Sequence, residues 1–423
     1  MVVTIVVLLI LAGVTISLLL DENGIIKKSK DARREYGQAK ANEQEDLSNL
    51  SDMIDEATAE PTPKVNVNTK AGDNSTINGK KGNANNPTIP AGYIPINTET
   101  SNWGNGKDAP SQDSVKHGLV IKDEQNNEWV WVPVPDVTVM CDTLNNTEYT
   151  LCGTTGETAV KTKLYSKSGI ISGKTRTTPG TSTSGSYREP DLVVGDDGIG
   201  YDAKDTYYKT ILGDTGTKEQ LAQLFADEYK AMIESVSKYG GFYIGRYELS
   251  GTVTEPTEKT GKTLTKTDWY NLYNACRSSK LQASDKVKTQ MIWGCQWDVT
   301  MNWLISSGAK TSDEVNKDSS TWGNYSNYNT ANNYTEGTTG YEKNAGSLQN
   351  TGSSENWKAN NIYDLAGNVW EWTQEAYYAG SRAVRGGDFY NNGYNYPASS
   401  RNGSGPATAT ATAYGSRPTL IIK

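Results

Sequence analysis

The sequence is short of the residues on which many catalytic sites depend. Among its 423 residues it has one histidine, His117, and four cysteines. A lone histidine excludes a histidine-rich metal site and argues against a Ser–His or Cys–His catalytic pair, so we interpret it as structural. We also find no paired carboxylates, phosphate-binding loop or other pair of nucleophile and base. These absences favour a binding protein over an enzyme.

The four cysteines do not form a metal-binding pattern. Cys141 and Cys152 bracket a polar loop, while Cys276 and Cys295 flank a stretch that runs from a helix to a strand. Neither pair has the spacing of a zinc site, and disulfides stay open for both. For Cys276 a buried, unpaired thiol is at least as good an interpretation, because free cysteine is often buried.

Basic residues are outnumbered by acidic ones, and tryptophan is missing from the first hundred residues. A formal net charge of -8 and a pI near 5.1 leave no basic stripe for a nucleic-acid partner, and solubility is the plainer consequence. All eleven tryptophans lie between Trp103 and Trp372. We therefore expect the hydrophobic core in the C-terminal part of the chain.

The N-terminal part begins with an apolar run. Met1 to Leu20 is polar only at Thr4, Thr15 and Ser17, and it is long enough to span a bilayer as a helix. A cleaved signal peptide fits less well, because no basic region precedes the run. Helical spacing resumes afterwards, which predicts a transmembrane and stalk helix over residues 1–58. Residues 59–115 are rich in Pro, Asn, Thr and Gly and predict a flexible linker.

The N-terminus resembles the first helix of type IV pilins and pseudopilins over roughly fifty residues, on the run VVTIVVLLILAGVTISLL and the ENGII break after it. The basic leader, processing glycine and usual glutamate of that family are missing from the sequence, so the true start stays open. The resemblance implies a membrane-anchored protein at the cell surface. Other pilin-like subunits would be its partners if the helix assembles into a pilus. An ordinary single-span anchor is the alternative.

The folded domain is expected over residues 116–423. Alternating apolar residues predict strands at 128–134 and 242–248. Apolar residues at helical spacing predict helices at 218–238, 267–277 and 296–306. The predicted fold class is therefore α+β.

Five motifs in this domain carry a family resemblance. They are GGFYIGRYE at 240–248, DWYNLYNACR at 268–277, QWDVTMNWL at 296–304, YDLAGNVWEWT at 363–373 and VRGG at 384–387. In that order they resemble the formylglycine-generating sulfatase-modifying domain, over residues 118–423. The resemblance implies a C-type-lectin-like fold with little regular structure for its size.

The GNVWEW segment contains the expected metal site. Trp370 and Trp372 alternate with Glu371 along a strand, which places both tryptophans in the core and Glu371 on the opposite side. The resemblance implies a structural calcium ion here, and oxygen ligands suit calcium. The implied ligands are the side chains of Asp364 and Glu371 and the carbonyl groups of Gly367 and Val369. A capped turn, in which Asp364 binds its own backbone, is the alternative.

The resemblance also places an active site. The enzyme family uses copper and two cysteines, because thiolates are the ligands that hold Cu(I). Counted from the Arg-Gly-Gly, these two positions fall on Asn391 and Tyr396, which supply no thiolate. We therefore expect neither copper nor catalysis.

A nearly uncharged stretch takes the place of that active site. Residues 389–416 read FYNNGYNYPASSRNGSGPATATATAYGS, with Arg401 as their one charge. Tyr, Ser, Gly and Asn are typical of antibody contact loops, because Tyr offers a large amphipathic face and small polar residues adapt their hydrogen bonds. The composition predicts a variable ligand-binding region over 388–416, bounded by a closing strand at 417–422. A loose tail is the alternative.

The expected contact residues are Tyr390, Asn391, Asn392, Tyr394, Asn395, Tyr396, Ser400, Asn402, Ser404, Thr408, Thr410, Thr412 and Tyr414. The residues expected to hold the frame of the stretch are Pro397, Ala398, Ser399 and Arg401.

The stretch resembles the variable region of proteins diversified by retroelements, where such a domain ends in RGG, an Asn-dense segment and a short strand. Mutated adenines would scatter asparagine codons into the residue types seen here. The implied function is an adhesin or receptor that binds an extracellular protein or glycan ligand. Two alternatives stay open, a divergent sulfatase-modifying oxidase and a filament subunit with a structural head.

Overall fold

The computed structural model describes residues 62–96, 115–140, 142–143, 164–165, 209–216, 218–378 and 381–423. The predicted transmembrane and stalk helix, Cys141 and Cys152 lie outside these residues. Within the described part, no helix is long and apolar enough to cross a membrane.

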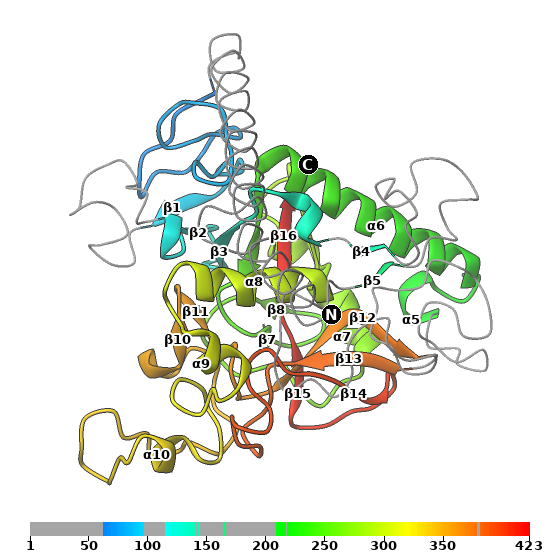
Figure 1. The fold of residues 1–423 in the computed structure, drawn as a ribbon. Helices are drawn as coiled ribbons and strands as arrows, with labels where there is room; N and C mark the ends of the chain where they lie inside the picture. Colours follow the sequence, from blue (N-terminus) through cyan, green and yellow to red (C-terminus); the bar gives the residue numbers. More distant parts are fainter. Residues whose placement is uncertain are drawn as a thin grey trace, which may run out of the picture. The chain divides into compact units, whose positions relative to one another are not determined.

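The described residues contain both helices and strands, and the last part of the chain, from β10 onward, consists of strands (Figure 1). The helices are α5 (Lys209–Leu212), α6 (Lys218–Tyr239), α7 (Trp269–Cys276), α8 (Gly294–Ser306), α9 (Ser312–Asn316) and α10 (Tyr328–Ala331), with 3-10 turns η2 (Val137–Met140), η5 (Ser279–Leu281) and η6 (Glu355–Trp357). The strands are β1 (Ile94–Ile96), β2 (Val120–Lys122), β3 (Glu128–Pro133), β4 (Asp142–Thr143), β5 (Leu164–Tyr165), β6 (Gly241–Gly245), β7 (Ser250–Gly251), β8 (Pro256–Thr257), β9 (Val287–Met291), β10 (Lys358–Ala359), β11 (Ile362–Tyr363), β12 (Trp370–Tyr378), β13 (Ser381–Arg385), β14 (Arg401–Pro406), β15 (Tyr414–Ser416) and β16 (Pro418–Ile422). The predicted α+β class is confirmed.

The larger sheet has six strands in the order β1-β2-β3-β6-β16-β9, and every neighbouring pair is antiparallel. Its central strands β3 and β6 are the two that alternation predicted. Trp131 of β3 lies opposite Tyr243 of β6, with their rings edge to face at 5.0 Å. Both side chains are fully buried, so this pair lies in the core of the domain.

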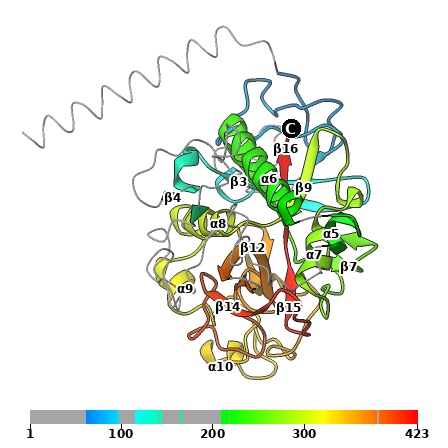
Figure 2. The same ribbon diagram turned by 90° about the vertical axis from the view of Figure 1, so that its right-hand side faces the viewer.

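The smaller sheet has four strands in the order β14-β13-β12-β15, with β12 and β15 parallel. Directly after β15, Arg417 leads into β16, so the chain passes from the smaller sheet into the larger one within a single residue (Figure 2). β14 and β15 lie inside the stretch predicted as a binding region. Their glycine-rich sequences do not alternate, and pairing with β13 and β12 defines them instead.

Three predicted helices are present as α6, α7 and α8. One face of α6 is buried against β6 and β16 (Figure 2). α6 ends at Tyr239, and Gly240 follows with φ +76°, a left-handed conformation that suits glycine. Asp268 caps α7 by accepting the Asn271 N–H at 2.9 Å. α8 packs against both β3 and β12 and so connects the two sheets.

Residues 62–96, part of the expected flexible linker, are folded onto the larger sheet. β1 adds an edge strand to it, and Ile89 is fully buried. Trp131 Nε1 donates to the Ala84 carbonyl at 3.0 Å, and the Tyr243 hydroxyl donates to the Thr88 carbonyl at 2.9 Å. The segment has no apolar periodicity of its own. Sequence patterns therefore do not reveal that it folds by packing on the larger sheet.

Candidate ligand-binding surface

The GNVWEW segment forms a turn that only glycine and asparagine fit easily. Gly367 has φ +75°, and a Cβ there would lie 2.3 Å from the Asn324 carbonyl oxygen. Asn368 follows with φ +56°, and its side chain donates to Glu248 and accepts from the Asn324 side chain at 3.0 Å. The turn then enters β12 with Trp372 fully buried and Trp370 nearly so. Both tryptophans are core residues, as predicted.

Glu371 does not face solvent, although it alternates with the tryptophans. Its side chain is buried in an ion pair with Arg417, whose Nη2 lies 2.7 Å from Oε1. The same guanidinium donates to the carbonyl groups of Gly245 at 3.0 Å and Tyr363 at 2.8 Å. Burial raises the pKa of Glu371, and Arg417 opposes that rise. We call Arg417, Glu371 and these two carbonyl groups the Arg417 junction.

This arrangement bears on the expected calcium site. Both carboxylate oxygens of Glu371 accept hydrogen bonds from Arg417, so the positive charge beside Glu371 is an arginine. Asp364 has φ +58° and accepts from the Thr351 hydroxyl at 2.9 Å and the Gly352 N–H at 2.8 Å. No cluster of three or more His, Cys, Asp or Glu side chains that could hold a metal occurs within the described ranges. Both carboxylates are therefore already bonded to protein groups, and the calcium site stays a prediction of the family resemblance.

The alternative interpretation of Asp364 was a turn that it caps through its own backbone. Its carboxylate instead binds residues 351 and 352, on a neighbouring loop. Because this loop is distant in sequence, no local pattern could have identified it.

A second buried ion-pair network holds strands β13 and β14, which flank residues 386–400. Asp298 of α8 pairs with Arg385 of β13 and with Arg401 of β14, the latter at 2.5 Å. Arg401 also pairs with Glu375 of β12 at 2.8 Å. All four side chains are buried. Arg401, expected as a frame residue, thus ties β14 to α8 and β12.

Between these strands, residues 388–396 form a loop that we call the tyrosine loop. Gly386 and Gly387 precede it with φ +90° and +80°, and a Cβ on Gly387 would lie 2.7 Å from the Tyr396 carbonyl oxygen. Asp388 Oδ1 accepts the N–H groups of Tyr390 and Asn391, both at 3.0 Å, which forms an Asx turn. Burial raises the pKa of Asp388 to about 6, although these two N–H groups favour its charged form.

The backbone of the tyrosine loop is held by a segment from elsewhere in the chain. The Asn391 carbonyl accepts from the Ser326 N–H at 2.9 Å and from its hydroxyl at 2.8 Å. The Gly393 carbonyl accepts the Ser319 N–H at 3.2 Å. A Cβ on Gly393 would lie 2.3 Å from the Ser320 nitrogen, so this close approach requires glycine. These contacts use backbone groups of the loop and leave its path independent of most of its side chains.

Two side chains of the tyrosine loop stand out by their exposure. Tyr390 is 67% exposed and Tyr394 is 57% exposed, and they are the exposed large hydrophobic side chains of the described residues. The Tyr390 ring contacts the buried Phe389 ring at a centroid distance of 4.1 Å. Exposed aromatic rings on an anchored backbone are typical of recognition surfaces.

The other expected contact residues differ in their environment. Asn395 is exposed, while Asn391, Asn392 and Asn402 are half-buried. Tyr396 and Tyr414 are half-buried with their rings edge to face against Trp370 and Trp372, at 5.3 and 5.1 Å. The Ser404 side chain lies outside the described part.

Ser400 was predicted to contact a ligand, and the structure shows that this prediction is wrong. Its side chain is 1% exposed, so it cannot contact a ligand from the surface. Ser399, Ala398 and Pro397 beside it are also buried. Trp297 Nε1 donates to the Ala398 carbonyl at 3.1 Å, which draws this segment into the core. Composition alone does not distinguish Ser400 from the exposed residues nearby.

Thr408, Thr410 and Thr412 lie on a separate loop, residues 407–413, that we call the threonine loop. Thr410 is exposed and the other two are half-buried. This loop rests on the segment before α7: the Ala411 carbonyl accepts the Lys266 N–H at 3.0 Å. The expected contact residues therefore divide between two loops with different supports.

The two described cysteines lie outside the tyrosine loop and the threonine loop. Cys276 and Cys295 are buried thiols, which agrees with the buried-thiol interpretation of Cys276. Burial raises the pKa of the Cys276 thiol, so it stays protonated at neutral pH and is a poor copper ligand. Asn391 and Tyr396 lie in the tyrosine loop at the positions where the enzyme's cysteines were expected.

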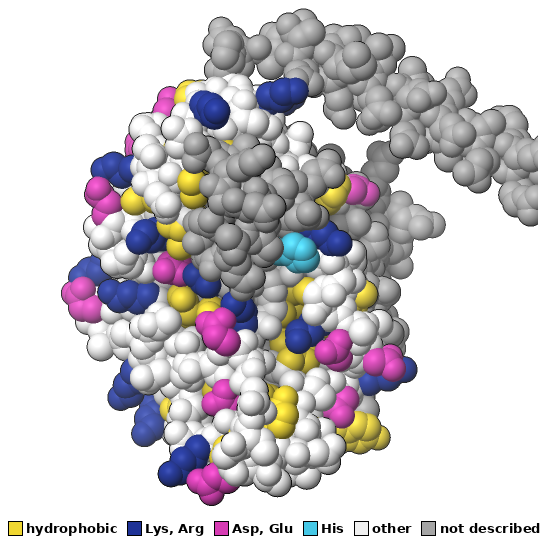
Figure 3. Space-filling view, turned by 90° about the vertical axis from the view of Figure 1, so that its left-hand side faces the viewer, with side chains coloured by type: hydrophobic (Ala, Val, Ile, Leu, Met, Phe, Trp, Pro, Cys, Tyr) yellow, Lys and Arg dark blue, Asp and Glu magenta, His cyan; other side chains and the backbone are white. Residues whose placement is uncertain are grey.

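Charge is mixed on the face drawn in Figure 3. Lysine and arginine side chains alternate there with aspartate and glutamate side chains. Over the described residues of this face, neither sign forms a continuous patch. This face therefore offers no extended field of one sign to a charged polymer.

Comparison with known proteins identifies part of the chain. Residues 299–418 match the sulfatase-modifying factor enzyme 1-like domain, which confirms the resemblance drawn from the GNVWEWT and RGG motifs. Treponema denticola variable protein 1 is a similar solved structure, with 12% identity, a TM-score of 0.25, and coverage of 70% of this chain and 96% of that chain. No curated protein sequence matches the chain.

Proposed function

We propose that this protein binds a ligand through the tyrosine loop and that its sulfatase-modifying-factor-like domain acts as the scaffold. The observation that carries the proposal is the exposure of Tyr390 and Tyr394 on a backbone held by residues 319–327. Tyrosine side chains lose little conformational entropy on binding and offer both apolar and hydrogen-bonding contact.

We further propose that the domain is not an enzyme. Asn391 and Tyr396 stand at the expected cysteine positions, and neither side chain can bind Cu(I) as a thiolate or form a disulfide. The buried, protonated Cys276 does not replace them.

Diversification by a retroelement and display at the cell surface extend the proposal. The support is the composition of residues 389–416 and the apolar run of Met1–Leu20. The ligand would then be an extracellular protein or glycan. The neighbouring DNA tests diversification: we expect a reverse transcriptase gene and an imperfect copy of the codons for this stretch. Alleles that differ at positions without a template adenine would contradict it.

Binding is tested on protein and glycan arrays with the full chain. The comparison pairs a Tyr390→Ala/Tyr394→Ala variant with a Lys317→Ala control, which changes an exposed residue of another segment. We expect signals that the tyrosine variant loses and the control keeps, with unchanged melting temperatures in both. Signals that are equal in all three proteins would reject the tyrosine loop as the binding surface.

A further inference from the structure

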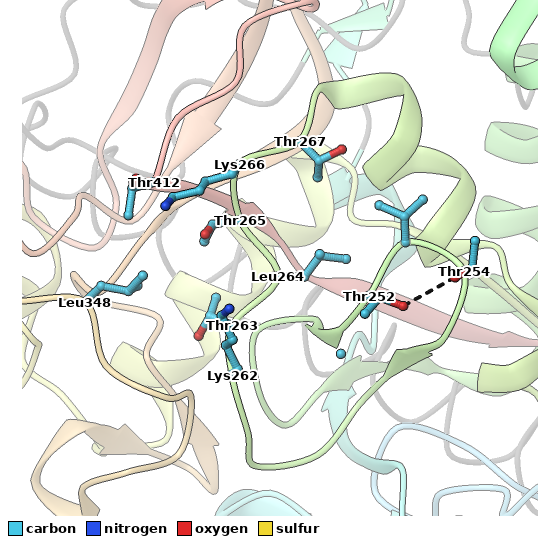
Figure 4. A pocket seen from close by; sticks show the side chains of 12 residues that line it. Thr252, Thr254, Lys262, Thr263, Leu264, Thr265, Lys266, Thr267, Leu348 and Thr412 are labelled. Carbon is cyan, nitrogen blue, oxygen red and sulfur yellow. Dashed lines mark hydrogen bonds between the residues drawn. The ribbon is translucent and has the colours of Figure 1, made fainter.

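A groove lies beside the threonine loop and apart from the residues that hold the tyrosine loop. Its volume is about 570 Å³, which is within the range of roughly 300–1,000 Å³ found for ligand sites. Figure 4 shows residues 262–267 running along it, with Thr252 and Thr254 on one side and Leu348 and Thr412 on the other. Residues from four separate segments therefore converge on this groove.

The charge of the groove is positive although the protein is acidic overall. Lys262 and Lys266 both line it and are exposed. None of its 12 lining residues, all within the described part, is acidic. Neither lysine has a salt-bridge partner among the described residues, unlike Lys280, which pairs with Glu255. In a chain with a net charge of -8, such a site selects for negative groups.

The remaining lining residues favour a peptide. Val253, Leu264 and Leu348 supply apolar contact, and the threonines supply hydroxyl groups that both donate and accept hydrogen bonds. None of the 12 lining residues is aromatic, so the groove has no flat ring on which a sugar could stack. Alternating acidic and apolar side chains on an extended peptide would match two lysines beside an apolar floor.

The groove is linked to the C-terminal stretch. The Lys266 N–H donates to the Ala411 carbonyl at 3.0 Å, and the Lys266 side chain extends toward Thr412 (Figure 4). One wall therefore comes from the stretch proposed to vary and the other walls come from outside it.

We propose that this groove binds an acidic peptide segment of a protein ligand. The lysines bind its carboxylates, and the apolar residues bind the side chains between them. This proposal is independent of the proposed function, because the groove includes no residue of the tyrosine loop.

The test is selection of peptides on the full chain. Random octapeptides displayed on phage are selected on four proteins: the original chain, Lys262→Gln/Lys266→Gln, Thr254→Trp, and a control, Lys70→Gln/Lys80→Gln, which makes the same charge change at exposed lysines outside the groove. Thr254 is exposed, so a tryptophan there fills the groove without disturbing the core. The melting temperature of each variant confirms folding.

We expect the original chain and the control to enrich peptides with at least two acidic residues. The double lysine variant should bind the best of these about tenfold more weakly, and Thr254→Trp should abolish binding. Tyr390→Ala/Tyr394→Ala should leave it unchanged, which separates this test from that of the proposed function. The proposal is overturned if acidic peptides are not enriched, if the double lysine variant binds them equally well, or if lysine-dependent binding occurs only with an oligouronate sugar.

Discussion

The Arg417 junction and the tyrosine loop are stabilised in opposite ways. At the junction, the buried Arg417 side chain joins β12 to the ends of β6 and β11 through the Glu371 carboxylate and two backbone carbonyl groups. In the tyrosine loop, backbone groups make the anchoring contacts, and the Tyr390 and Tyr394 side chains are exposed. Side chains therefore determine the fold at the junction, while the loop can change its side chains and keep its path.

The largest expected effect is at the junction. Arg417→Leu leaves the buried Glu371 carboxylate without its guanidinium, so we expect a loss of about 3–5 kcal/mol in the free energy of unfolding. Urea unfolding followed by tryptophan fluorescence measures it. Lys280→Leu, at an exposed pair, is the control and should change stability by less than about 1 kcal/mol. A similar, small effect of both changes would contradict the role of Arg417.

The next largest effect is expected from a matched pair of substitutions inside the variable stretch. Ser400→Tyr forces a large ring into a buried site and should cost about 1–3 kcal/mol or more, whereas Asn395→Tyr adds an exposed ring and should cost less than about 0.5 kcal/mol. Thermal unfolding of both variants makes the comparison. Equal stabilities of the two variants would contradict the difference in burial between Ser400 and Asn395.

The pH dependence of stability tests the role of the buried Asp388 in the tyrosine loop. Its pKa rises from 3.8 to about 6 on folding, so its contribution to stability is fully present below about pH 4 and is lost as the pH rises through 6. Asp388→Asn keeps the oxygen that accepts the Tyr390 and Asn391 N–H groups and removes the buried charge. We expect it to stabilise the protein by about 1–2 kcal/mol at pH 7 and to have little effect at pH 4. If the original chain and Asp388→Asn show the same dependence of stability on pH, the buried Asp388 charge is not destabilising.

The exposed tyrosines should have the smallest effect of any substitution on stability. Tyr390→Ser and Tyr394→Ser remove exposed rings, so each should change the free energy of unfolding by no more than about 0.5 kcal/mol. Chemical denaturation tests this expectation. A loss above about 2 kcal/mol would show that these rings support the fold.

Chelation should have no effect on stability. Because Arg417 already neutralises Glu371, we expect EDTA to leave the melting temperature unchanged. A lower melting temperature that Glu371→Ala abolishes would establish the calcium site that the family resemblance implied.

The sequence predicts much of the frame because its signals are local. The alternation in β3, the apolar face of α6 and the two tryptophans of β12 each reveal burial from residues close together in the chain. The folding of residues 62–96 and the pairing of Glu371 with Arg417 depend on contacts between distant segments. No local pattern contains those contacts, so local reasoning predicts a linker for residues 62–96 and finds no partner for Glu371.

The candidate site is predictable in part for the same reason. Composition indicates that residues 388–416 include a binding surface, but it assigns Ser400 and Asn395 the same role. Their burial differs because Trp297 of α8 draws the segment beside Ser400 into the core. The groove beside the threonine loop is also invisible to composition, since it is lined by residues from four separate segments.

The most direct measurement is a library in which positions 390, 391, 394 and 395 are randomised together in the full chain and displayed on yeast. Selection against a protein unrelated to this one, such as lysozyme, then asks whether the tyrosine loop is a general binding surface. The account predicts that most members stay folded, as resistance to protease shows, and that binders emerge whose affinity is lost when these four positions revert. A library that mostly unfolds, or that yields no binders while remaining folded, would contradict it.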